Sequence, residues 1–291
     1  MLVFLTGATG YIGSAVAQAL RRAGYAVVGL ARSDDQVRTL AAQGLGAHRG
    51  DLRDPASLAE GARNADAVIH TALAAAPDAG PVDRAAVEAM LGALAQFNRP
   101  FVYTSGCWVV GNTGDKVADE DTPPAPTPLV AWRPAVEQLV LDAARHGVQG
   151  IVLRPAMVYG CGGGLVASFG QSAREHGAAR VIGDGGNRWT FVHLDDLAAL
   201  YALALRAASG TLLFAAHGAA VRVRDVAEAA SRAAGAHGEV ETVPLEQARQ
   251  TMGPLADALV LDQQISGERA QRVLGWRPQG PPVLEELARG L

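Results

Sequence analysis

The chain is poor in cysteine and lysine and has no long apolar run. Its two cysteines, Cys107 and Cys161, form no Cys-x-x-Cys motif and have no paired histidines beside them, which argues against a structural zinc site. So few cysteines suit a reducing cytoplasm, where disulfides are rare. No basic block accompanies the net charge of −4, and no apolar stretch approaches the ~18 residues of a membrane span. We therefore expect a cytoplasmic protein that binds no metal, nucleic acid or membrane.

The chain does contain a regular alternation of short apolar runs and longer helical patterns. Strands are predicted at residues 2–6, 26–31, 47–48, 67–71, 101–105, 150–154 and 211–215. Helices are predicted between them, among others at residues 13–22, 34–43, 82–96, 131–146 and 195–206. Strands that alternate with helices of this length form a parallel sheet that binds ligands at the carboxyl ends of its strands. The pattern predicts an α/β fold with a Rossmann-type doubly wound parallel sheet.

The alternation changes after about residue 156, where glycine-rich loops appear at residues 161–164 and 183–186. We expect residues 1–156 to form the sheet domain, with residues 191–215 returning to it. Residues 157–190 and 216–291 are expected to form a smaller C-terminal lobe over the carboxyl edge of the sheet. Such a lobe would hold a small-molecule substrate.

The loop after the first predicted strand is the most informative motif. Gly7, Gly10 and Gly13 lie three residues apart, between a strand and a helix. In this setting the first glycine permits a tight turn, the second lets a pyrophosphate approach the backbone, and the third lets helix and strand pack closely. Free N–H groups at the start of the helix then face the phosphates. An ordinary turn is the alternative, but the flanking elements favour a dinucleotide-binding site.

Five further segments follow this loop in a fixed order. They are residues 50–54, 67–72, 101–111, 154–160 and 191–197. Together with residues 6–13 they resemble the short-chain dehydrogenase/reductase superfamily, in its extended, epimerase/dehydratase-like branch. The resemblance spans nearly the whole chain, and it is specific for the superfamily without naming a reaction.

The resemblance implies which residues contact the cofactor. Asp51 would bind the adenine amino group, Leu52 would offer its backbone, and Thr71 and Ala72 would line the passage toward the nicotinamide. The complete expected set is Gly7, Thr9, Gly10, Tyr11, Ile12, Gly13, Arg32, Ser33, Asp51, Leu52, Thr71, Ala72, Thr104, Pro155 and Val158.

The end of the second strand bears on the choice between NAD and NADP. NAD-preferring sites usually have an acidic residue here for the ribose diol, whereas this chain has Ala31, followed by Arg32 and Ser33. A guanidinium can pair with a 2′-phosphate, and a serine hydroxyl can add a hydrogen bond. The alternative is that Arg32 is a solvated residue at a strand end. We expect NADP, with NAD less favoured.

The superfamily's usual acid–base pair, Tyr-x-x-x-Lys, is absent. Aligned by the Glu-Gln-Leu run at residues 137–139, Trp132 stands where the tyrosine is expected and Val136 where the lysine is expected. Two residues are expected to take part in catalysis instead. Ser105 follows the fifth predicted strand and Tyr159 lies near the expected nicotinamide, while Arg133 is interpreted as a surface charge.

Three functions remain open on these observations. The first is an NADP-dependent oxidoreductase that acts on a small organic carbonyl or carbinol, with a non-standard proton donor or water. The second is a nucleotide-sugar epimerase or dehydratase, to which Arg174, Arg180 and Arg188 could contribute diphosphate contacts. The third is an NADP-binding sensor or scaffold without turnover. Relatives in the superfamily often dimerise, so a homodimer is also left open.

Overall fold

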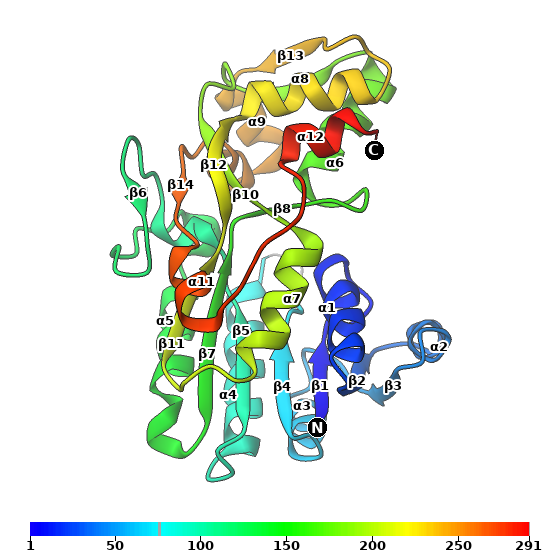
Figure 1. Cartoon of the computed structure of the whole chain (residues 1–291), viewed down its shortest axis with the longest axis vertical. Coiled ribbons are helices and arrows are strands. Elements are labelled where there is room, and N and C mark those ends of the chain that lie inside the picture. Colours follow the sequence, from blue (N-terminus) through cyan, green and yellow to red (C-terminus); the bar gives the residue numbers. More distant parts are fainter. Residues whose placement is uncertain (75–76, 291) are drawn as a thin grey trace.

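The computed structural model describes residues 1–74 and 77–290 and centres on a seven-stranded sheet (Figure 1). Each pair of neighbouring strands is parallel, in the order β11-β7-β5-β4-β1-β2-β3. The strands are β1 (Leu2–Thr6), β2 (Ala26–Ala31), β3 (Gly46–Arg49), β4 (Ala67–His70), β5 (Pro100–Thr104), β7 (Gln149–Pro155) and β11 (Thr211–Ala215). The predicted doubly wound α/β fold is therefore confirmed.

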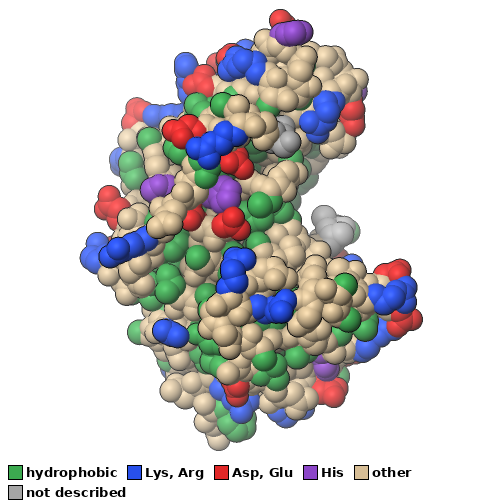
Figure 2. All heavy atoms as spheres, turned by 45° about the vertical axis from the view of Figure 1, so that its right-hand side comes forward, with side chains coloured by type: hydrophobic (Ala, Val, Ile, Leu, Met, Phe, Trp, Pro, Cys, Tyr) green, Lys and Arg blue, Asp and Glu red, His purple; other side chains and the backbone are tan. Residues whose placement is uncertain are grey.

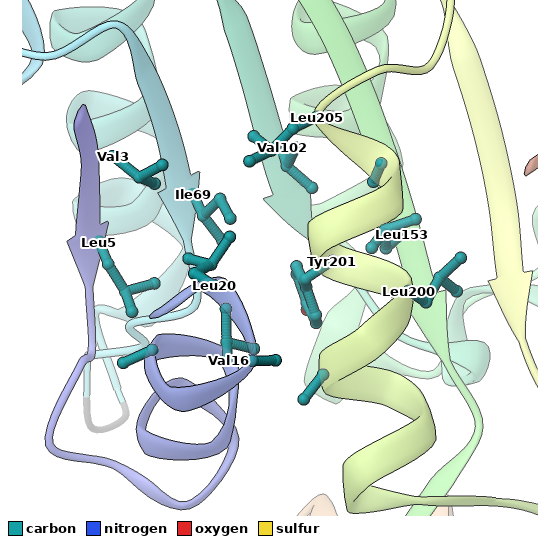
Figure 3. Packing of buried hydrophobic residues seen from close by; sticks show 14 of the residues in the cluster. Val3, Leu5, Val16, Leu20, Ile69, Val102, Leu153, Leu200, Tyr201 and Leu205 are labelled. Carbon is teal, nitrogen blue, oxygen red and sulfur yellow. The ribbon is translucent and has the colours of Figure 1, made fainter. Parts of the chain in front are cut away.

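Helices cover both faces of this sheet. On one face lie α1 (Tyr11–Arg22), α2 (Asp34–Ala42) and α7 (Leu194–Ala204), and on the other lie α3 (Pro55–Arg63), α4 (Ala79–Leu94) and α5 (Arg133–Leu141). Strand β1 shows why its run is apolar throughout. Val3 and Leu5 belong to the core cluster on the side of α1 and α7 (Figure 3). Phe4 belongs to the cluster on the opposite face, with α3. A strand buried on both faces has no side free for polar residues.

The strand order places a crevice at the carboxyl end of β1. The chain runs from β1 to β2 and β3 on one side, then returns to β4 on the other side of β1. Loops that follow β1 and β4 therefore diverge, and a ligand can enter between them. The glycine loop follows β1, so it lies at this crevice.

Helix α5 is shorter than its sequence pattern predicts. Residues 131–146 were expected to be one helix, but α5 spans only Arg133–Leu141. Pro134 has no N–H and fits only in a first turn, so the helix begins beside it. Tighter turns flank it, η2 (Pro128–Val130) and η3 (Asp142–His146).

A smaller lobe lies beyond the carboxyl ends of the strands, at the top of Figure 1. Its strands are β8 (Met157–Tyr159), β9 (Ala179–Ile182), β10 (Arg188–His193), β12 (His217–Arg222) and β13 (Val240–Val243). Its helices are α6 (Gly164–His176), α8 (Val223–Ala233), α9 (Leu245–Met252), α10 (Leu255–Leu259) and α12 (Val283–Ala288). Residues 191–193, expected to return to the sheet domain, instead pair with β8 in the lobe, and the return begins with α7. The outline of the molecule is notched between lobe and sheet domain (Figure 2).

The C-terminal segment ties the lobe to α7. Trp276 follows α11 (Glu268–Leu274), is buried, and donates its indole N–H to the backbone of Asp196. The Asp196 carboxylate accepts the backbone N–H groups of Gln279 and Gly280, both at 2.8 Å. Strand β14 (Gln264–Ile265), also in this segment, pairs with β6 (Val117–Ala118). The last part of the chain thus holds the lobe in place over the sheet.

Within residues 1–74 and 77–290, no helix is long and apolar enough to cross a membrane.

Candidate cofactor and substrate site

The glycine loop forms the floor of a groove of about 570 Å³. Gly7 has a φ of +73°, and its carbonyl accepts the N–H of Gly10 at 2.9 Å, which closes a tight turn. A Cβ on Gly13 would lie 2.0 Å from that same carbonyl oxygen. No side chain caps the start of α1, so its first N–H groups remain available to a phosphate. The cradle fits a pyrophosphate.

Most of the residues expected to contact a cofactor line this groove. They are Gly7, Thr9, Gly10, Tyr11, Ile12, Gly13, Arg32, Asp51, Leu52, Thr71 and Ala72. The sequence pattern missed five others that line it, namely Leu30, Gln36, Arg53, Leu73 and Ala74. Each lies within three residues of an expected residue along the chain, and this proximity was the only available signal.

Several groove residues also hold the loop itself. Thr71 donates its hydroxyl to the carbonyl of Thr6 at 2.7 Å, and Tyr11 donates to the carbonyl of Gly160 at 2.8 Å. Burial holds the pKa of Tyr11 above its ordinary value, so its hydroxyl keeps the proton that it donates. Both hydroxyl groups therefore donate to backbone carbonyls of the protein and not to a ligand.

Ser33 lies apart from the groove wall that the other expected residues form. Its hydroxyl accepts the N–H of Gln36 at 3.3 Å and caps α2. The Arg32 backbone N–H donates to the side-chain oxygen of Gln36 at 2.7 Å, while the Arg32 side chain remains at the groove. Of the two residues expected at the 2′-position, Arg32 lines the groove, whereas Ser33 does not and caps α2 instead.

A second cavity of about 320 Å³ adjoins the groove, since Ile12, Leu73 and Ala74 line both. We call it the apolar cavity, because most of its wall is hydrophobic. Its other lining residues are Ala79, Thr104, Ser105, Gly106, Cys107, Trp108, Leu129, Val130, Trp132, Arg133, Pro155, Ala156, Met157, Val158 and Leu165. The expected cofactor residues Thr104, Pro155 and Val158 therefore lie here, at the inner end of the groove.

Few side chains in the wall of the apolar cavity could donate a hydrogen bond or a proton to a ligand. Ser105 is 6% exposed, and its hydroxyl is buried without a partner among the described residues. Thr104 shares a 2.6 Å hydrogen bond with the hydroxyl of Tyr201, so its side chain is engaged. Burial raises the pKa of the Cys107 thiol to about 12, which leaves it protonated and unreactive. Ser105 therefore has the one hydroxyl in the described wall that is not engaged by another protein group.

The start of α5 faces the cavity in a different register from the one predicted. Val136, assigned to the missing lysine, is buried in the core beneath the sheet and does not line the cavity. The cavity is lined instead by Leu129 and Arg133, four residues apart, together with Trp132. Arg133 is partly buried and donates to the carbonyl of Thr104 at 2.8 Å, so it is not the surface charge that was expected.

Tyr159 is not brought to the site. Its ring packs against Phe191 and His193, and its hydroxyl donates to the carbonyl of Pro281. Burial raises its pKa to about 12. Neither the groove nor the apolar cavity includes it, because strand alternation turns Val158 toward the cavity and Tyr159 into the lobe.

A buried ion pair supports the cavity from behind. Arg154 donates from Nε and Nη2 to Glu137 at 2.9 and 2.5 Å, and both side chains are under 5% exposed. The pair joins β7 to α5, which carry Pro155 and Arg133. No group of three or more metal-ligating side chains occurs in the part of the chain that the structure describes.

A doubly wound parallel sheet with a glycine-lined groove at its switch point defines a Rossmann-type dinucleotide-binding protein. The NAD dependent epimerase/dehydratase family model matches residues 3–212, and the chain belongs to this family. Its members are NAD(P)-dependent oxidoreductases and epimerases.

Several known proteins are similar to this chain. The uncharacterized protein C2A9.02 of Schizosaccharomyces pombe is 32% identical, covering 99% of this chain and 98% of that protein. A 2-alkyl-3-oxoalkanoate reductase of Stenotrophomonas maltophilia is 28% identical, covering 81% of this chain and 76% of that protein. The UDP-glucose 4-epimerase of Thermus thermophilus, solved with NAD, has a TM-score of 0.81 and 23% identity, with both chains fully covered. This structural likeness shows the shared fold.

Proposed function

We propose that this protein is an NADPH-dependent reductase of small apolar carbonyl compounds. One observation carries the proposal: the dinucleotide groove opens into the apolar cavity, and Ile12, Leu73 and Ala74 line both. A carbonyl in the cavity therefore lies beside the inner end of a dinucleotide in the groove. Hydride transfer needs mainly this shared orientation of cofactor and substrate.

Ser105 is proposed to hold the carbonyl oxygen. When bound, NADPH supplies the hydride, and the carbonyl oxygen gains negative charge as the carbon accepts it. A hydroxyl fixed in an apolar wall stabilises that charge more than water would. Ser105 has such a hydroxyl, with no partner among the described residues. Because the chain lacks the usual tyrosine, water supplies the proton that completes the alcohol.

The proposal is tested by mixing the protein with NADPH and a panel of aldehydes and ketones and following the loss of NADPH absorbance. Ser105→Ala is expected to lower kcat/KM by about 100-fold, because the developing oxyanion loses a donor. Thr113→Ala, in a loop outside both cavities, is the control and should retain activity. Turnover that survives Ser105→Ala unchanged contradicts the role of Ser105. NADPH binding without oxidation across the panel would favour a sensor or scaffold.

The cofactor preference is the second part of the proposal. Strand β2 ends without an acidic residue, and the Arg32 side chain lies at the groove. Arg32→Ala is expected to raise the Kd for NADPH by about 10-fold or more, because one charged partner of the 2′-phosphate is lost. The Kd for NADH should stay the same. Arg38→Ala, on the exposed side of α2, is the matched control. A wild-type preference for NADH would contradict the assignment.

A nucleotide-sugar substrate is less well supported by the arginines considered for its diphosphate. Arg188 is committed to Asp262 at 2.9 and 2.6 Å and also contacts Asp115. Arg180 pairs with Glu241 at 2.8 Å. Arg174 is exposed on α6 and lines neither the groove nor the apolar cavity. The small, largely apolar cavity agrees better with the reductases among the relatives, which include one acting on 2-alkyl-3-oxoalkanoates.

A further inference from the structure

Arg133 occupies the cavity wall in a position that its own helix does not favour. It is the first residue of α5, where the positive end of the helix dipole disfavours a cation. Strand β5 holds it there: Nη1 donates to the Thr104 carbonyl at 2.8 Å and to the Tyr103 hydroxyl at 3.3 Å. The guanidinium also lies over the ring of Trp132, 4.7 Å from its centroid. Helix end and guanidinium together make this wall positive.

A buried carboxylate fixes Arg133 through Tyr103. Asp83 on α4 is 1% exposed, and its Oδ2 accepts the Tyr103 hydroxyl at 2.7 Å. Its Oδ1 lies 3.1 Å from Nε2 of His70. Burial holds the pKa of Tyr103 above its ordinary value, so the hydroxyl keeps the proton that it donates to Asp83. The same oxygen accepts from Arg133, so Tyr103 joins the anion to the cation and limits the rotation of the guanidinium.

These contacts use only Nη1, and they leave Nε and Nη2 of Arg133 without a protein partner among the described residues. This edge of a guanidinium presents two parallel N–H groups that match a carboxylate. Other arginines of the chain bind carboxylates through this same edge. Arg154 binds Glu137 through Nε and Nη2, and Arg188 binds Asp262 in the same way.

A second unpaired donor lies next to Arg133 on the cavity wall. Ser105 follows directly on Thr104, whose carbonyl binds Arg133, and its buried hydroxyl has no partner among the described residues. The surrounding wall includes Trp108, Leu129 and Met157. The wall of this largely apolar cavity thus includes one buried hydroxyl and one guanidinium edge, both without a protein partner among the described residues.

We propose that Arg133 binds a carboxylate of the substrate, so that the preferred substrates are small oxo acids with an apolar body. This inference rests on the proposed reductase function, with the carbonyl oxygen on Ser105 and the carboxylate on Arg133. The adjacency of the two donors selects acids whose carbonyl is close to the carboxylate. Asp83 and Tyr103 act as positioning residues for Arg133.

The test compares phenylpyruvate with its methyl ester as substrates in the presence of NADPH. The wild-type protein is expected to show a kcat/KM about 10-fold or more higher for the acid. Arg133→Gln should lower kcat/KM for the acid by about 10- to 100-fold, mainly through KM, and change that for the ester little. Arg133→Lys keeps the charge but loses the two parallel N–H groups, so it should restore part of the preference for the acid over the ester.

Tyr103→Phe tests the positioning role. It keeps the ring in the core but removes the link to Asp83, and it is expected to raise KM for phenylpyruvate while sparing the ester. Tyr201→Phe is the matched control, because it removes a buried tyrosine hydroxyl that bonds to Thr104 and not to Arg133. The acid-to-ester ratio should stay at its wild-type value in this control. An equal change of the ratio in both variants would contradict the positioning role.

A binding measurement separates failure of this inference from failure of the proposed function. Phenylpropionate, which carries no carbonyl to reduce, is titrated into the protein with NADP while the fluorescence of the cavity tryptophans is followed. Binding that disappears in Arg133→Gln supports the inference even when no carbonyl compound is turned over. Equal turnover of acid and ester by the wild type overturns it. An Arg133→Gln variant whose only change is a higher Kd for NADPH also overturns the inference.

Discussion

Replacing Gly13 with alanine is expected to raise the Kd for NADPH by about 100-fold, or about 2.7 kcal/mol, within the range for overpacking a closed site. The added Cβ would lie 2.0 Å from the carbonyl oxygen of Gly7 and 2.9 Å from the hydroxyl of Thr71. The oxygen belongs to the backbone and also accepts the N–H of Gly10, so the loop must deform to make room. Titration of NADPH against the variant, followed by cofactor fluorescence, measures the effect.

Gly92→Ala provides the control for this prediction. Gly92 lies in α4, and a Cβ there would meet no atom within 4 Å. Alanine is favoured over glycine inside a helix by about 1 kcal/mol, so this variant should be at least as stable as the wild type and bind NADPH equally well. Wild-type affinity in Gly13→Ala would show that the loop does not hold the pyrophosphate as described.

Glu137→Ala is expected to destabilise the protein by about 3–5 kcal/mol, the cost of leaving a buried charge without its partner. Arg154 would lose both of its ionic hydrogen bonds, and it is 4% exposed, so water cannot replace them. The ring of Phe214, 5.3 Å away, is its other favourable contact. Chemical denaturation of the variant and the wild type gives the difference in the free energy of unfolding.

An exposed ion pair serves as the comparison for Glu137. Arg180 and Glu241 join β9 to β13 with side chains that are 46% and 51% exposed. Glu241→Ala should therefore change the free energy of unfolding by no more than about 1 kcal/mol. Equal losses in the two variants would mean that burial does not decide the strength of the Arg154 pair.

The sheet domain could be predicted well because its signals are local. Short apolar runs identify the strands, and helical spacing that ends at a glycine or a capping residue identifies the helices. Neither signal requires knowledge of distant contacts. The glycine loop is of the same kind, since Gly7, Gly10 and Gly13 meet within one turn of chain. Most of the other groove residues were predicted from the family resemblance, whose motifs stand in the loops after the strands.

The apolar cavity could not be predicted in the same way, because its polar groups meet only through tertiary packing. Asp83 lies on α4 and Tyr103 on β5, and nothing in their local patterns relates them to Arg133. One signal was present: His70 ends an apolar strand, and Asp83 lies on the same helix face as Ala86, Val87 and Met90, which suggests that both are buried and pair. The side of β8 on which Tyr159 falls depends on how the lobe closes, and that is set by distant residues.

The attachment of the C-terminal segment to Asp196 has a consequence for synthesis. The sheet strands β2, β3, β4, β5 and β7 can pair as the chain emerges, because each joins a strand already made. Trp276, Gln279 and Gly280 leave the ribosome near the end, yet their contacts with Asp196 fasten the lobe above the sheet. A nascent chain can therefore form the groove beside the glycine loop well before the lobe is fastened above the sheet. A ribosome stalled shortly before residue 276 should display a chain that already retains NADPH but does not yet recognise its substrate.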